Sequence, residues 1–64
     1  MTTITHANGR MEHVTHPIDA MQILRAQYPD MESEDDGDRI LVWACEAEAR
    51  GNDASRTVAV VRIA

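Results

Sequence analysis

Three histidines, His6, His13 and His16, are the first candidates for chemistry in this chain of 64 residues. Neutral imidazoles that lie close together can bind zinc, and a hairpin over this region would bring the three near one another. Zinc usually needs further ligands at fixed spacing, and the single cysteine, Cys45, falls in a pattern typical of a buried strand. We therefore interpret the histidines as polar residues of an edge hairpin that discourage edge-to-edge pairing, and we predict no metal site.

The segment Glu32-x-Glu34-x-Asp36-Gly37 has the alternating oxygens and the glycine that begin a calcium-binding loop. Such a loop requires a bidentate glutamate at its twelfth position, where this chain has Trp43. The residues after the segment also read as a strand, whereas the motif requires a helix there. We predict no specific calcium site.

No nucleophile is recognisable in the sequence. Cys45 has no activating neighbour, and neither Ser33 nor Ser55 lies in a nucleophile elbow or an oxyanion-hole context. The three glycines are isolated, so no loop can cradle a phosphate. A domain of this size buries only about 60% of its unfolded surface, which leaves little room for a deep pocket. We predict that the protein is not an enzyme and needs no cofactor.

The acidic residues are the most distinctive feature of this sequence. Eleven acidic residues against six basic ones give a net charge of −5, which would repel nucleic acid and anionic membranes and favours a neutral or basic partner. We predict that the partner-binding residues are the eight carboxylates between positions 32 and 53: Glu32, Glu34, Asp35, Asp36, Asp38, Glu46, Glu48 and Asp53.

The elements that must position them begin with a hairpin over residues 2–15. Asn8-Gly9 between two β-branched runs predicts its turn, because both residues tolerate positive φ. A two-residue turn and a three-residue loop with a glycine bulge are both possible. We favour the second, because it places Ile4 and Val14 on one face, where both can be buried.

A helix should follow from residue 17 to about residue 28. Pro17 suits the first helical position, and Thr15 or His16 can act as the cap. Residues at three- and four-residue spacing form one apolar stripe that should cover a sheet: Pro17, Ala20, Met21, Leu24 and Tyr28.

The acidic run 30–38 contains no basic residue, so we expect a solvated loop. Residues 39–50 alternate as one long strand whose odd-numbered side chains should face the helix. In that arrangement Cys45 lies opposite Val60, and Glu46 and Glu48 project together from the other face. A turn and a final strand over residues 56–63 complete the chain.

These elements predict one α+β domain over residues 1–64, an antiparallel four-stranded sheet with one helix on one face in the order ββαββ. The other face would expose the apolar patch Val42, Ala44, Val61 and Ile63. That patch could anchor a partner or form a homodimer. With no signal segment and no apolar run long enough to span a bilayer, we expect a cytoplasmic protein.

The acidic run 31–38, which leads into a strand predicted to end Glu46-Ala47-Glu48, resembles the small anti-CRISPR proteins of phages and mobile elements. More specifically, the whole chain resembles an inhibitor of the type I-C system in size, acidity and general appearance. The resemblance implies an acidic DNA mimic in the bacterial host cell. Such a mimic would block target DNA by occupying the DNA- or PAM-recognition surface of a Cascade complex, on its large Cas8 subunit.

Two other hypotheses stay open at this point. The chain could be a structural or assembly module that forms a homodimer through its apolar patch. It could also be an antitoxin-like regulator that holds a basic toxin. All three hypotheses predict binding to protein and none predicts direct binding to nucleic acid.

Overall fold

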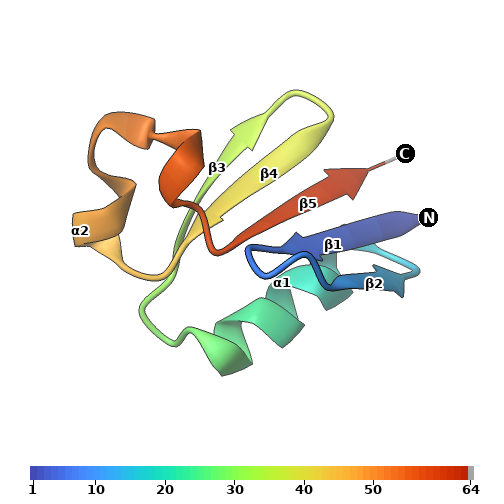
Figure 1. Ribbon diagram of the computed structural model, residues 1–64. Coiled ribbons are helices and arrows are strands. Elements are labelled where there is room, and N and C mark those ends of the chain that lie inside the picture. Colours follow the sequence, from blue (N-terminus) through green and yellow to red (C-terminus); the bar gives the residue numbers. More distant parts are fainter. Residues whose placement is uncertain (64) are drawn as a thin grey trace.

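The computed structural model describes residues 1–63, in which helix α1 crosses one face of a five-stranded antiparallel sheet (Figure 1). In chain order the elements are β1 (Thr2–His6), β2 (Met11–Val14), α1 (Pro17–Gln27), β3 (Glu32–Asp36), β4 (Arg39–Trp43), α2 (Glu46–Ala49), the 3-10 turns Arg50–Asn52 and Ala54–Arg56, and β5 (Ala59–Ile63). The strand order in the sheet is β2-β1-β5-β4-β3. The α+β class is confirmed, but the predicted four strands and single helix are not.

The first hairpin has the predicted three-residue loop. The backbone N–H of His6 donates to Arg10 O at 2.8 Å, and that of Gly9 donates to His6 O at 2.9 Å. Gly9 has φ +91°, a conformation that a glycine bulge needs and that other residues rarely adopt. Thr2 lies opposite Val14, so Ile4 and Val14 share a face as predicted.

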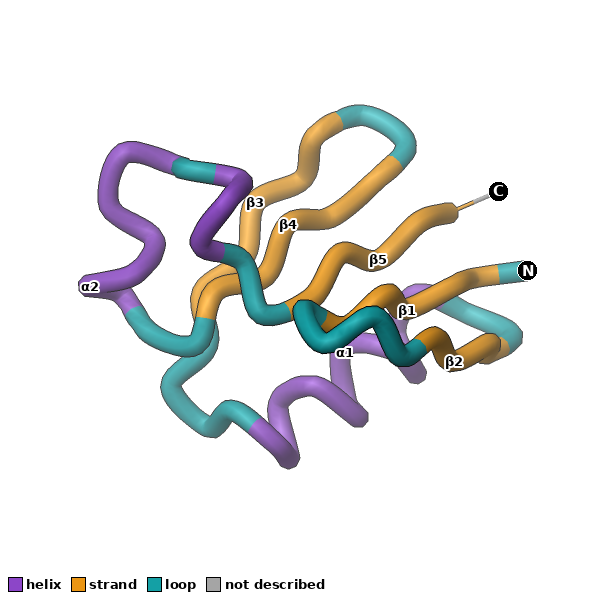
Figure 2. Tube along the Cα trace, in the orientation of Figure 1, coloured by secondary structure: helices purple, strands orange, loops and turns teal. Residues whose placement is uncertain are grey.

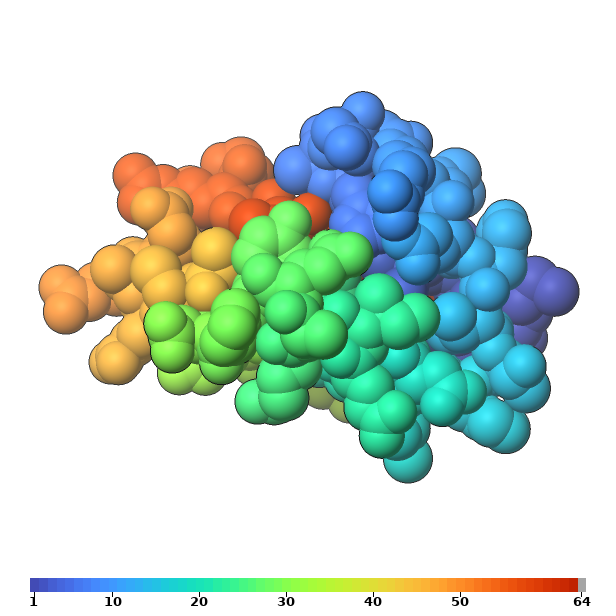
Figure 3. All heavy atoms as spheres, turned by 90° about the horizontal axis from the view of Figure 1, so that it is seen from below, coloured from blue at the N-terminus to red at the C-terminus, as the bar shows by residue number. Residues whose placement is uncertain are grey.

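Helix α1 ends one residue before the predicted boundary, and Tyr28 N–H closes it by donating to Leu24 O at 2.7 Å. Ala20 and Leu24 are fully buried against the sheet, because their spacing places both on one side of the helix. Seen from below, α1 and the segment after it cover this face of the sheet (Figure 3). The buried core consists of Ile4, Ala20, Leu24, Met31, Val42, Ala59 and Val61.

The even-numbered residues of β4 face α1, so the predicted orientation of this strand was wrong. Val42 is fully buried opposite Ala59, and Ile40 lies opposite Val61. The predicted apolar patch therefore does not exist as a surface, because Val42 and Val61 belong to the core. Val60 lies opposite Leu41 and not opposite Cys45.

The predicted strand over residues 39–50 ends at Trp43. Alanine and glutamate favour helix, and residues 46–49 form α2, which begins directly after a half-buried Cys45. The segment 44–57 folds back beside β3 and β4 (Figure 2). Trp43 is 1% exposed, and its indole N–H donates to the backbone oxygen of Asp53 at 2.9 Å. Burying this indole offsets the loss of strand pairing beyond residue 43.

The acidic run 30–38 is not a loop, because its residues 32–36 form the edge strand β3. Gly37 and Asp38 make a two-residue turn, and Gly37 has φ +71°, as a type II′ turn requires at its first central position. All five residues of β3 are exposed. Pairing with β4 uses the backbone, so the strand forms without an apolar side, and an ion pair between Asp36 and Arg39 offsets part of the repulsion.

Candidate acidic binding surface

Three carboxylates project from one face of β3. Glu32 lies opposite Trp43, Glu34 opposite Leu41 and Asp36 opposite Arg39, so all three point away from α1. Alternate residues of a strand lie about 7 Å apart on the same side. The regular carboxylate row that was predicted for Glu46 and Glu48 is therefore found on β3 instead.

Helix α2 adds a fourth carboxylate to this side of the molecule. Glu32 and Glu34 line a hollow of about 310 Å³, and Glu46 lines it from α2. The other lining residues are Ser33, Trp43, Ala49, Arg50 and Asn52. The acidic face, as the term is used below, consists of Glu32, Glu34, Asp36 and Glu46.

Part of this charge is compensated within the chain. Arg39 Nε and Nη2 both lie 3.0 Å from Asp36 Oδ2, and Asn52 Nδ2 donates to Glu34 Oε1 at 3.4 Å. Within residues 1–63, the carboxylates of Glu32 and Glu46 have no hydrogen-bond or ion-pair partner. These two are the groups most available to an external cation.

Sequence reasoning missed Arg50 and Asn52 in this hollow, because residues 39–50 were assigned to one strand. The helix-forming composition of residues 46–49 was the available signal. Arg50 makes no ion pair with any residue that the structure describes. It therefore leaves the neighbouring carboxylates without a fixed counter-charge.

The other four predicted residues lie apart from the acidic face. Asp35 projects from the opposite face of β3, Asp38 lies in the turn, and Glu48 is exposed on α2. Asp53 caps the 3-10 turn 54–56. Its Oδ1 accepts from the Ser55 hydroxyl at 2.7 Å and from Ser55 N–H at 2.9 Å. These hydrogen bonds lower the pKa of Asp53, which makes it a structural group.

The three histidines do not converge. His6 is buried on the helix side, where its Nε2 lies 3.2 Å from Glu12 Oε1. His13 lies on the other face, where its Nδ1 is 3.2 Å from the Thr3 hydroxyl, and His16 is exposed just before α1. Across residues 1–63, no group of three or more histidine, cysteine or carboxylate side chains is arranged to hold a metal ion.

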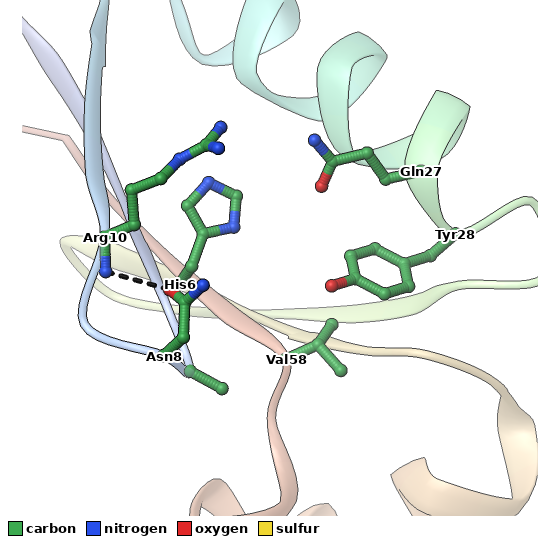
Figure 4. Close-up of a pocket in the computed structure, with 7 residues that line it drawn as sticks. His6, Asn8, Arg10, Gln27, Tyr28 and Val58 are labelled. Atoms are coloured by element: carbon green, nitrogen blue, oxygen red, sulfur yellow. Dashed lines mark hydrogen bonds between the residues drawn. The ribbon is translucent and has the colours of Figure 1, made fainter.

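A second hollow, of about 260 Å³, lies between the β1–β2 turn and the end of α1 (Figure 4). It is lined by His6, Ala7, Asn8, Arg10, Gln27, Tyr28 and Val58. Arg10 Nη2 donates to Glu12 Oε1, which also contacts His6, and the Arg10 hydrogen bond is the main cause of the lowered pKa of Glu12. Glu12 already pairs with the guanidinium of Arg10, so this arginine is not a free cation for an anion bound in the hollow.

Neither helix in the described part of the chain has the length and apolar character that crossing a bilayer demands. Comparison of the chain with protein-family models, curated proteins and solved structures gives no significant match.

Proposed function

We propose that the protein is an inhibitor that binds a cationic, nucleic-acid-binding surface of a partner and mimics the phosphate backbone. The observation that supports this is the row of Glu32, Glu34 and Asp36 on one face of β3, with Glu46 beside it across the hollow. Arginine and lysine side chains bind carboxylates as they bind phosphates, through charge-assisted hydrogen bonds.

A hairpin is a suitable support for such mimicry. The two-residue turn and the five-residue register with β4 fix the backbone positions of the β3 carboxylates, so little backbone order has to be created on binding. Their common sign would accelerate encounter with a basic groove and make the association rate fall as salt rises. Glu32 and Glu46 should contribute most to binding, because neither forms an ion pair within the described residues.

The resemblance to small anti-CRISPR proteins makes a type I Cascade complex the first partner to test. The expected docking site is the DNA- or PAM-recognition surface of its large subunit, which the acidic face would occupy in place of target DNA. The inhibitor would then act by competition, without any chemical step.

The test is a competition experiment with purified Cascade and immobilised protein. We expect duplex DNA that contains the target and its PAM to displace the protein. The double substitution Glu32→Arg and Glu46→Arg should weaken binding at least about tenfold, because like charges then face the basic surface.

The matched control is Asp19→Arg with Asp30→Arg, which changes net charge equally at exposed positions outside the acidic face. This control should bind Cascade nearly as well as the unmodified protein, and urea unfolding should show that both variants fold. Equal binding by the Glu32/Glu46 variant would reject the proposed function. So would capture of Cascade that duplex DNA does not affect.

A further inference from the structure

Strand β3 leaves one whole side of its backbone unpaired. It is an edge of the sheet, and its hairpin register pairs Asp36 with Arg39 across the two-residue turn. In such a hairpin the residues that flank the turn exchange backbone hydrogen bonds. The bond from Ile63 N to Asp38 O at 3.0 Å agrees with this, because it turns the backbone of Asp38 toward β5 and that of Arg39 toward β3.

The alternation of an antiparallel ladder then determines which groups of β3 are free. The N–H and C=O groups of Glu32, Glu34 and Asp36 point toward β4, whereas those of Ser33 and Asp35 point outward. Among residues 1–63, β4 is the only strand that pairs with β3, and all five residues of β3 are exposed. The outer edge is therefore open to an added strand.

The charge of β3 indicates which kind of strand could pair with its outer edge. Four of its five residues are acidic, so a second copy paired antiparallel would place carboxylates opposite carboxylates, which is destabilising. A strand with arginine or lysine at every second position would instead align its cations with Glu32, Glu34 and Asp36. We propose that β3 accepts an extended basic strand of the protein partner as a sixth strand of the sheet. This inference rests on the proposed function, because the same carboxylates choose the partner.

The test uses a synthetic peptide of alternating arginine and threonine as the probe. A second peptide with the same sequence carries N-methyl groups at alternate residues, which removes the donors along one edge and leaves the charge unchanged. We expect the methylated peptide to bind the protein about tenfold more weakly, because pairing along the edge loses its hydrogen bonds. Hydrogen exchange at the amides of Ser33 and Asp35 should slow when the unmethylated peptide binds.

The protein itself offers a second variant, Ser33→Pro, which removes one outward N–H and keeps every charge. Proline is tolerated on an edge strand where its nitrogen faces solvent, so the ladder to β4 should survive. We expect about tenfold weaker binding of the unmethylated peptide, with Ser33→Thr as the control that keeps the N–H. If Ser33→Pro fails to fold, the methylated peptide still decides, because it leaves the protein unchanged.

Equal affinity for the two peptides, or unchanged exchange at Ser33 and Asp35, would overturn strand addition. If Glu32→Arg with Glu46→Arg still weakened Cascade binding at least about tenfold in that case, the proposed function would stand without strand addition. If the peptides behaved as expected but the Glu32/Glu46 variant bound Cascade as well as the unmodified protein does, the proposed function would be rejected and strand addition would stand. A dimer of the protein paired through β3 would also overturn the inference.

Discussion

Replacing Trp43 by phenylalanine tests how the acidic face is assembled. The indole is 1% exposed, and its hydrogen bond to Asp53 O at 2.9 Å ties residues 44–57 back onto the sheet. Phenylalanine keeps much of the apolar burial but removes the donor. The loss should be about 1–3 kcal/mol, the usual cost of leaving a partly buried polar group unsatisfied. Total stability for a chain of this length is about 3–10 kcal/mol, so the change is a large fraction of it.

Urea unfolding followed by circular dichroism measures this loss, because Trp43 is the only tryptophan and its fluorescence disappears with the substitution. With a slope of about 1 kcal/mol per M for a small domain, the midpoint should fall by about 1–3 M. Tyr28→Phe is the matched control, since the hydroxyl of Tyr28 makes no hydrogen bond to another described residue. Its midpoint should move by less than about 0.5 M. An unchanged midpoint for Trp43→Phe would refute the role assigned to the indole bond.

Further predictions concern the core, a cap and a turn. Val42→Ala should cost about 2–3 kcal/mol and Val60→Ala less than about 1 kcal/mol in urea unfolding, because only Val42 is fully buried; equal costs would contradict the assigned face of β4. The pKa of Asp53 is lower in the folded protein, so its contribution is complete above the unfolded pKa and is lost as pH falls through the folded value. The stability difference between the unmodified protein and Asp53→Ala should therefore shrink in acid, and a constant difference from neutral pH to about pH 3 would contradict the cap. Gly37→Ala should cost about 1 kcal/mol in thermal unfolding, through its φ of +71° and not through a clash; an unchanged midpoint would contradict the turn type.

Local signals predicted the N-terminal half of the fold from sequence. Asn8-Gly9 and Pro17 act through the backbone of a few neighbouring residues, and both the hairpin register and the start of α1 were correct. The boundary after Trp43 was missed because small residues at alternate positions from 45 to 49 fit a strand as well as a helix. The face of β4 toward α1 was also missed, because Leu41, Val42 and Trp43 are all buried, so alternation along the strand gave no polar side to distinguish the two faces.

The candidate site could be predicted by residue type but not by placement. Charge repulsion suggested that residues 30–38 stay unpaired, yet an edge strand needs no apolar side chain to pair its backbone with β4. Glu46 was assigned to a strand and reaches the acidic face from α2 instead. Asp53 carries the same charge as the other carboxylates, but in the folded protein the backbone N–H and hydroxyl of Ser55 both donate to it, so it acts as a cap.

The sign of the charge on β3 distinguishes two reasons for its composition. An exposed edge strand is protected from aggregation by charge of either sign, and lysine is the residue that natural edges use most for this purpose. This chain contains no lysine, and none of the five residues of β3 is basic. A strand with charges of both signs would form ion pairs within itself and would not repel a second copy of the chain. Edge protection therefore explains why β3 carries charge of one sign but not why that sign is negative. A cationic partner would account for the sign, because the same row of carboxylates that prevents pairing between copies of the chain would favour pairing with a basic strand.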